Sequence, residues 1–236
     1  MLSDFLGFTA SCLYLQGMMF FKLCLATLCL CASAVAAEEI LADLNPKQTA
    51  ILLKGEPVSV QHDIPNLPWP KVVVYRLVHA TPEEVAAIFF DYKNAKSFIP
   101  NLLKSEVSLR RSAQDHEVDY VLDVPLLPDE AYTARNRLAS VEDGVYFFDW
   151  NLVRATSTKA SLGNLRIEPR GKGALMRYTN LVTPNSGMAG LLRSVAVDQM
   201  NDTVEALVRR VEKQKSTNPL ELQKRVKELR AALLET

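Results

Sequence analysis

Three histidines are the side chains of this chain best suited to acid–base or metal chemistry, and they are widely scattered. His62 and His116 each precede a carboxylate, Asp63 and Glu117, while His79 stands alone. Adjacent residues on a strand point to opposite faces, so neither pair can form a metal site by itself. All four cysteines lie before residue 38. The rest of the chain therefore has no thiol nucleophile, disulfide or cysteine metal site.

Sequence motifs of common enzyme classes are also absent. The chain has no G-x-S-x-G nucleophile turn, no glycine-rich phosphate loop and no H-E-x-x-H pair. A formal net charge of 0 over 236 residues gives no argument for binding nucleic acid. We therefore expect no enzymatic activity, no cofactor, no metal and no nucleic-acid partner.

The N-terminal segment has the pattern of a secretory leader. An apolar run over 23–35 ends in Ala34-Val35-Ala36, the small-x-small form of a signal-peptidase site. We predict that residues 1–36 are a cleaved signal peptide, with the true start at Met18 or Met19 left open, and that the mature chain is secreted into the periplasm. A retained membrane anchor is the alternative, because 5–37 is long enough to span a bilayer.

The mature chain is organised around a long amphipathic helix expected over 184–214. Its apolar residues recur every three or four positions, which places them on one stripe. Pro184 to Gly187 break the preceding pattern and offer capping groups. A helix of this kind needs a broad apolar partner. The stripe consists of Met188, Leu191, Leu192, Val195, Met200, Val204, Leu207, Val208 and Val211.

Segments of alternating polarity supply that partner. They follow a β-branched strand over 71–79 and a helix that Thr81 begins. The segments are 103–111, 117–124, 131–141, 145–153, 162–169 and 174–183. Consecutive strands joined by short turns indicate an antiparallel meander. We predict an α+β fold in which a curved antiparallel sheet wraps around the long C-terminal helix. The periodicity leaves open whether a cavity or a filled core lies between them.

Two further helices flank this domain. Asn45 to Gln48 have the form of a capped helix start, and Asn218-Pro219 begin a second amphipathic helix after the long one. This tail either folds back on the domain or pairs with a partner helix. The expected organisation is a signal peptide (1–36), an N-terminal helix and extension (37–71), the main domain (72–215) and a C-terminal amphipathic helix (216–236).

Three stretches resemble the START-like lipid-binding domains of the helix-grip superfamily, which also includes polyketide cyclases and birch-pollen allergen proteins. The first is VVYRLV at 73–78 with TPEEV at 81–85 and FIP at 98–100. The second is VPLLPDEAY at 124–132, and the third is RGKGALMRY at 170–178 with PNSG at 184–187. Leu127 and Ala131 depart from the aromatic and basic residues often seen at the second stretch. This departure leaves the subfamily, and therefore the ligand, open.

The resemblance implies a helix-grip fold whose cavity, between the sheet and the long helix, holds a hydrophobic ligand. We expect the partner to be a lipid or other hydrophobic small molecule, and we allow for transient membrane contact and lipid transfer. A cyclase or aromatase using the same cavity, and a protein-interaction module with a filled core, are the alternatives. The candidate cavity residues are Tyr120, Arg137, Trp150, Met176, Tyr178, Met188, Leu191, Leu192 and Val195.

Overall fold

The computed structural model describes residues 40–124, 127–142, 144–185 and 192–235. The chain forms two compact units, one up to Thr49 and one from Ala50 onward. In the first, Asn45 and Gln48 exchange two hydrogen bonds of 2.9 Å at the start of α2 (Pro46–Leu53). This is the reciprocal capping arrangement that the sequence predicts.

The second unit is built on an 8-stranded antiparallel sheet with the order β1-β2-β8-β7-β6-β5-β4-β3. Strands β3 to β8 form the predicted meander, and β8 then pairs with β2. The strands are β1 (Val58–His62), β2 (Lys71–Val78), β3 (Leu102–Ser112), β4 (Asp115–Leu122), β5 (Glu130–Glu142), β6 (Val145–Ala155), β7 (Thr158–Arg170) and β8 (Gly173–Pro184). The sheet therefore begins with β1, before the domain boundary expected at residue 72.

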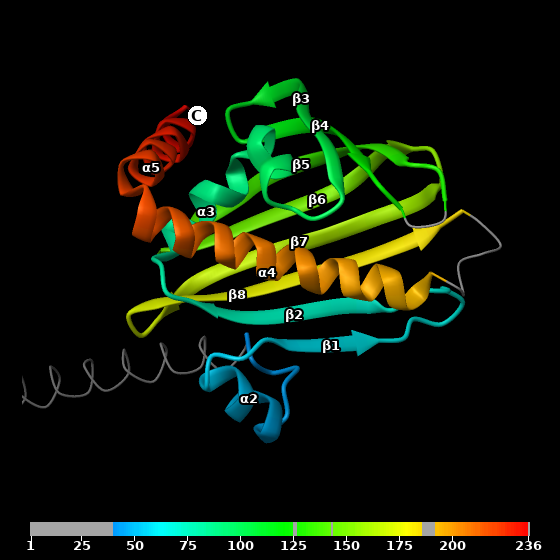
Figure 1. Cartoon of the computed structure of the whole chain (residues 1–236), viewed down its shortest axis with the longest axis horizontal. Helices are drawn as coiled ribbons and strands as arrows, with labels where there is room; N and C mark the ends of the chain where they lie inside the picture. Colours follow the sequence, from blue (N-terminus) through cyan, green and yellow to red (C-terminus); the bar gives the residue numbers. More distant parts are fainter. Residues whose placement is uncertain (1–39, 125–126, 143, 186–191, 236) are drawn as a thin grey trace, which may run out of the picture. The chain divides into compact units, whose positions relative to one another are not determined.

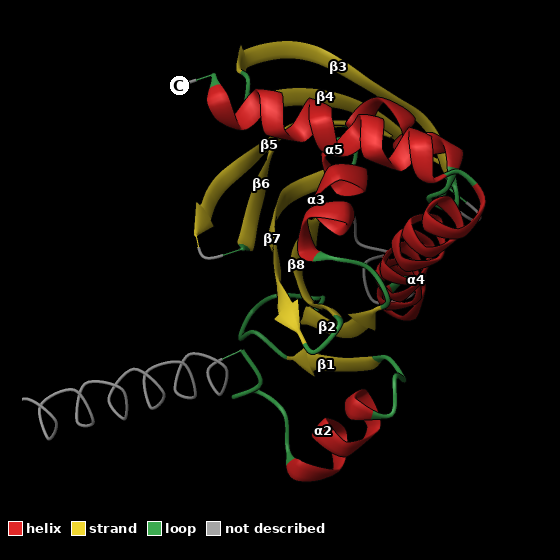
Figure 2. Ribbon diagram, turned by 90° about the vertical axis from the view of Figure 1, so that its left-hand side faces the viewer, coloured by secondary structure: helices red, strands yellow, loops and turns green. Residues whose placement is uncertain are grey.

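Three helices lie on one side of this curved sheet (Figures 1 and 2). They are α3 (Pro82–Phe90), which the short 3-10 helix η1 (Tyr92–Ser97) follows, α4 (Arg193–Thr217) and α5 (Pro219–Leu234). Figure 1 shows α4 running across the sheet, with the strands curving around it. The predicted α+β architecture of a curved antiparallel sheet around a long helix is thus confirmed. Among the described helices, none is long and apolar enough to cross a membrane.

Side-chain caps fix where two of these helices begin. At α3, Thr81 Oγ1 accepts from Glu84 N at 3.2 Å, and Glu84 Oε2 accepts from Thr81 N at 2.8 Å. At α5, Asn218 Oδ1 accepts from Glu221 N, and Pro219 takes the first helical position. α4 begins at Arg193 without a side-chain cap. The predicted helix residues Met188 and Leu191 lie outside the described residues.

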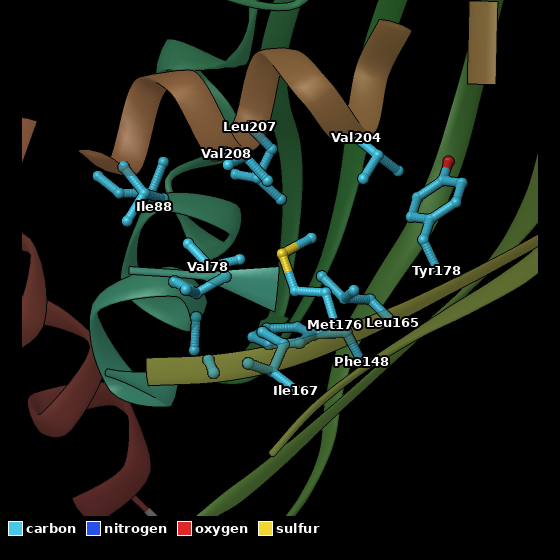
Figure 3. Close-up of a cluster of buried hydrophobic side chains, with 14 of the residues drawn as sticks. Val78, Ile88, Phe148, Leu165, Ile167, Met176, Tyr178, Val204, Leu207 and Val208 are labelled. Carbon is cyan, nitrogen blue, oxygen red and sulfur yellow. The ribbon is translucent and has the colours of Figure 1, made fainter. Parts of the chain in front are cut away.

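The C-terminal half of α4 is packed into the main core. Val208 and Val211 are at most 1% exposed. They belong to one cluster with residues of the sheet and of α3, which Figure 3 shows meeting between the two layers. The facing residues are Val78, Ile88, Phe148, Leu165, Ile167 and Met176. This half of the interface is a filled core.

The C-terminal helix α5 folds back on the domain. Leu222 and Leu229 of α5 are buried in the same core cluster. Arg230 pairs with Glu83 of α3 through two contacts of 2.6 Å. The apolar stripe of α5 is therefore covered by the same chain. Of the two arrangements that the sequence left open, α5 folds back on the domain and does not leave this stripe free for a partner helix.

Candidate functional site

A cavity of about 700 Å³ lies between the sheet and the N-terminal half of α4. Its floor comes from β4 to β8, and its roof from α4 between Leu192 and Leu207. Phe89 of α3 and Tyr92 of η1 close the inner end, next to the filled core. The outer end lies where β4, β6 and β8 finish and α4 begins. A volume of this size is in the usual range of ligand pockets.

Where α4 faces the cavity, small and polar side chains stand among its apolar residues. In the N-terminal half, Ala196, Gln199 and Thr203 stand among the residues that face the sheet. These side chains are smaller or more polar than the leucine and valines of the C-terminal half. On the floor, Ala134 and Ser161 are small as well. The helix and the sheet therefore hold a space open that these side chains do not fill.

Aromatic rings form much of the cavity wall. Tyr120 and Tyr132 stack with ring centroids 5.1 Å apart, and Trp150 lies 5.1 Å from Tyr178 and 6.0 Å from Phe89. These contacts join β4 to β5 and β6 to both β8 and α3. Such a wall gives the cavity a large apolar surface with polar atoms at a few fixed points.

Gly163 allows the Trp150 indole to lie against β7. A Cβ at this position would stand 2.3 Å from Trp150 Cζ2 and 2.5 Å from the carbonyl oxygen of Thr179. Neither neighbour can accept an atom so close without moving. The absence of a side chain at Gly163 thus sets how deep Trp150 sits, and with it the depth of the cavity floor.

The outer end carries carboxylates that differ in their surroundings. Glu130 is buried and accepts from Thr158 N at 2.9 Å and from Thr156 Oγ1 at 2.7 Å, with further hydrogen bonds from Ser157. Burial opposes ionisation of Glu130, but these donors outweigh it and hold its pKa below the usual value. Asp123 and Asp129 are exposed at the same end.

Gln199 ties α4 to the loop that follows η1. Its Oε1 accepts from Asn101 Nδ2 at 2.9 Å, and its Nε2 donates to the carbonyl oxygen of Pro100 at 2.9 Å. Asn101 holds a left-handed backbone conformation, with φ of 61°, which asparagine tolerates better than most residues. This link fixes the side of the cavity between α4 and β3.

Five of the nine candidate residues line this cavity. Tyr120, Trp150 and Tyr178 rise from the floor, while Leu192 and Val195 lie in the roof. Met188 and Leu191 fall outside the described residues. The structure therefore brings the strand aromatics and the start of α4 together around one space, as the sequence predicts, although ligand contact by these residues remains a proposal.

Arg137 and Met176 do not line the cavity. Asn136 faces it, so Arg137, its neighbour on β5, points to the other face of the sheet and donates to both carboxylate oxygens of Asp149 at 2.8 and 2.9 Å. Met176 faces inward but pairs with Ile167 in the filled core, where it is 0% exposed. For Arg137, the sequence did not show which face of β5 the side chain occupies. For Met176, it did not show that this position on β8 lies beside the filled core and not beside the cavity.

Several residues that line the cavity were not among the candidates predicted from the sequence. Phe89, Tyr92, Tyr132 and Asn136 all border the cavity. For β5 a signal was available, because Tyr132 and Asn136 share the strand face of Ala134 at two-residue steps. For Phe89 and Tyr92 no local pattern shows which of several aromatic residues at the end of α3 turns toward the sheet.

None of the three histidines belongs to the cavity. His116 is buried, with its ring 5.5 Å from that of Phe90, and burial together with Arg110 lowers its pKa. His79 is exposed beside Glu212. In the described part of the chain, no group of three or more histidine, cysteine or acidic side chains could hold a metal ion.

Comparisons with known proteins place this geometry in a fold family. No family model and no curated protein matches the chain. The STAR-related lipid transfer protein of Xanthomonas axonopodis matches with a TM-score of 0.60 at 13% identity, over 66% of this chain and 93% of that one. Human STARD10 matches with 0.55 at 14% identity, over 69% and 74%. The Zhui aromatase/cyclase of Streptomyces matches with 0.51 at 13% identity, over 69% and 98%.

These similarities show that the chain has the START-like helix-grip fold. The fold occurs in lipid-transfer proteins and in aromatase/cyclase proteins alike. At such low identity the likeness concerns the fold alone, so the function must be argued from the cavity.

Proposed function

We propose that this chain is an exported protein that binds a lipid or other hydrophobic small molecule in the cavity beneath α4. The main support for this proposal is the difference between the two halves of α4. The C-terminal half of α4 packs into a filled core, while its N-terminal half covers about 700 Å³ of space with an aromatic wall. Transfer of an apolar molecule into such a space gains about 0.8 kcal/mol for each methylene removed from water. Burial of the apolar part of a ligand can therefore provide the binding free energy without any chemical reaction.

The similarity to a lipid transfer protein supports carriage of the ligand as the biological role. The Xanthomonas protein of that name shares the fold over nearly its full length. In our proposal the ligand enters at the outer end and leaves by the same path. The carried molecule would then move between membranes or partners without covalent change.

An aromatase or cyclase activity is the second candidate, because the Zhui protein has the same fold. The cavity favours binding over this reaction. Among the described lining residues there is no histidine, lysine or arginine to act as a base or electrophile. Burial raises the pKa of Tyr120, Tyr132 and Tyr178, so these phenols stay protonated and are poor bases at neutral pH.

A protein-interaction role is less well supported. It predicts a filled core and a free C-terminal helix. The domain instead has a cavity, and α5 buries Leu222 and Leu229 against α3 and α4.

Export forms part of the proposal and rests on residues 1–36, which lie outside the described residues. The measurement is the mass and N-terminal sequence of the protein recovered from the periplasm of a secreting host. A mature form that begins at Ala37 supports cleavage after Ala36. Recovery of the uncleaved chain in the membrane fraction would favour the anchor instead.

Native mass spectrometry tests the binding itself. The chain is purified from a secreting host, analysed intact and then extracted with solvent to identify bound molecules. We expect a discrete added mass of lipid size, and we expect Leu192→Trp, which enlarges a roof residue, to lose it. A protein that remains ligand-free after incubation with mixed lipids and sterols would refute the proposal.

A further inference from the structure

We propose that the ligand is an amphiphile with an uncharged hydroxyl group, which binds at the inner end of the cavity between Tyr92 and a row of polar side chains on the floor. The apolar part of the ligand then points toward the outer end. This inference rests on the proposed binding function and specifies the class of ligand and its orientation. Two observations support it, which are the position of the polar row and the buried polar atoms that lack a partner there.

The first observation is a row of cross-strand partners on the cavity floor. Residues directly opposite each other in an antiparallel sheet point to the same face, so the row runs straight across it. From β2 to β4 the row consists of Val72, Asn180, Gly163, Trp150, Asn136 and His116. Asn180, Trp150 and Asn136 line the cavity. Two amide side chains of different strands therefore stand at the same level of the floor.

The rows on either side of these amides are mainly apolar. Two positions along the same strands toward the filled core stand Tyr178, Leu165, Phe148 and Leu138. Two positions toward the outer end stand Val182, Ser161, Leu152 and Ala134, which line the cavity. Asn180 and Asn136 thus form a polar belt at the inner end, next to the filled core.

Tyr92 faces this belt from the helical layer. It follows α3 in η1 and lines the cavity. Its ring meets the ring of His116, the last member of the row, edge to face with the centroids 5.8 Å apart. The hydroxyl-bearing side chain therefore closes the inner end on the side opposite the sheet.

The second observation concerns the hydrogen bonds of these side chains. Tyr92 is 4% exposed, and both its Oη and Asn180 Oδ1 are buried. In the part of the chain that the structure describes, neither atom has a hydrogen-bond partner. Asn136 differs, because its Nδ2 donates to the carbonyl oxygen of Ala134 at 3.1 Å. Buried polar atoms in proteins nearly always have a partner, so we infer that the ligand supplies one here.

The chemistry of the two atoms specifies the polar group of the ligand. Asn180 Oδ1 can only accept a hydrogen bond, whereas Tyr92 Oη can donate or accept one. The amide of an asparagine turns readily about its last side-chain bond, which aims its oxygen at the cavity. A hydroxyl group suits both atoms, because it donates and accepts.

An ionised carboxylate or phosphate fits this end poorly. Such a group has no proton to donate to Asn180 Oδ1. The lining residues in the described ranges include Asp123, Asp129 and Glu130 but no cationic side chain. A buried anion would therefore find no counter-charge in the cavity, whereas an uncharged hydroxyl group needs none.

A displacement assay on the purified, delipidated chain tests the hydroxyl contact. Diphenylhexatriene, a hydrocarbon dye that fluoresces in apolar surroundings, occupies the cavity, and decanol displaces it. Tyr92→Phe removes only the hydroxyl group, and Asn180→Leu replaces the amide with an apolar side chain of similar size. Each should raise the decanol concentration required for half-displacement by about threefold to tenfold. The dye has no hydrogen-bonding group, so decanol competition is expressed relative to the dye affinity of each variant.

Matched substitutions outside the cavity are the controls. Tyr146→Phe removes a hydroxyl group from a buried tyrosine of the core cluster. Asn151→Leu removes an amide from an exposed position of β6. Neither residue lines the cavity, so neither substitution should change decanol competition.

The two tryptophans of the chain report the orientation of the ligand. Trp150 lies in the polar row, whereas Trp69 lines the cavity just before β2, beside the end of β8 at the outer end. A bromine atom quenches tryptophan fluorescence only at close range. Decanol with bromine on its terminal carbon should therefore quench Trp69, observed in Trp150→Phe, more strongly than Trp150, observed in Trp69→Phe.

Several results would overturn the inference. Unchanged decanol competition in both Tyr92→Phe and Asn180→Leu refutes the hydroxyl contact, as does an equal loss in the control variants. Stronger quenching of Trp150 than of Trp69 refutes the orientation. In each of these cases the dye still binds and the proposed function stands. A wild type that takes up neither dye nor decanol removes the proposed function and the inference together.

Discussion

Two valine-to-alanine substitutions on α4 separate its packed half from its cavity half. Val211 lies in the filled core and is 0% exposed, whereas Val195 lines the cavity roof and is 37% exposed. The same atoms are removed from the same helix in both variants. Alanine has the higher helix propensity by about 0.5 kcal/mol in a helix interior, where Val211 lies, and this term cannot exceed that value at Val195 in the first turn.

The expected difference follows from burial. Removal of two carbons from Val211 forfeits about 1.6 kcal/mol of transfer free energy, and the space left behind adds to this loss. After the gain of about 0.5 kcal/mol in helix propensity, Val211→Ala should lower the free energy of unfolding by about 1.5–2.5 kcal/mol. Val195→Ala leaves a cavity that is already open, so its effect should stay within about 0.5 kcal/mol.

Urea unfolding followed by far-ultraviolet circular dichroism measures both free energies under one condition. The two variants should show equal denaturant slopes and clearly different midpoints. Equal losses of about 2 kcal/mol would mean that α4 is packed along its whole length in solution. That result would refute the division of the helix into a packed half and a cavity half.

Three further predictions concern the roof, the floor and the back of the domain. Leu192→Trp should impair lipid uptake, measured by native mass spectrometry, more than it lowers the melting temperature. Equal effects on both would identify Leu192 as an ordinary core residue. Leu191, where the sequence predicts the same effect of a tryptophan, lies outside the described residues. Gly163→Ala should displace Trp150, shift tryptophan fluorescence and cost about 1–3 kcal/mol of stability, whereas an unchanged spectrum would contradict the close approach seen at this glycine. Leu229→Ala should cost about 2–4 kcal/mol of unfolding free energy, because this residue of α5 is 0% exposed, and a negligible loss would mean that α5 is detached from the domain in solution.

The ionised Glu130 side chain should make the stability of the fold sensitive to acid. Its hydrogen bonds hold the folded-state pKa below the usual value, so it stabilises the fold above the unfolded pKa of about 4.3 and loses this contribution as the pH falls through the folded value. Glu130→Gln should therefore flatten the fall in stability below about pH 4.3. Identical pH profiles of the two proteins, measured by urea midpoints, would contradict this assignment.

Much of the fold follows from local signals in the sequence. The stripe of α4 and the alternation of β4 and β6 place the inward faces correctly, because burial of one face imposes a period on the chain. Thr81 and Asn218 begin helices as predicted, since their side chains satisfy free backbone amides. The corrections concern Arg137 and Met176. The sheet face that Arg137 occupies and the place of Met176 in the filled core both depend on how the strands pair, which the residue types do not show.

The cavity could not be derived in the same way. The stripe residues Val195 and Val211 look alike in sequence, but Val195 lines the cavity and is 37% exposed, whereas Val211 is 0% exposed in the filled core. The difference depends on which floor residues stand opposite each turn of the helix, such as Ala134 or Phe148. This match is set by the tertiary arrangement, which a periodic pattern does not encode.

The pairing of β2 with β8 has a consequence for how the chain folds. Val72 pairs with Asn180, and the whole meander lies between them in sequence. During synthesis the hairpin of β1 and β2 is made first, yet β2 cannot complete its sheet until β8 has been made. Contacts of such long sequence separation slow folding, and the unpaired edge of β2 stays open to other strands in the meantime. We therefore expect the nascent chain to need protection of this edge until its C-terminal third arrives.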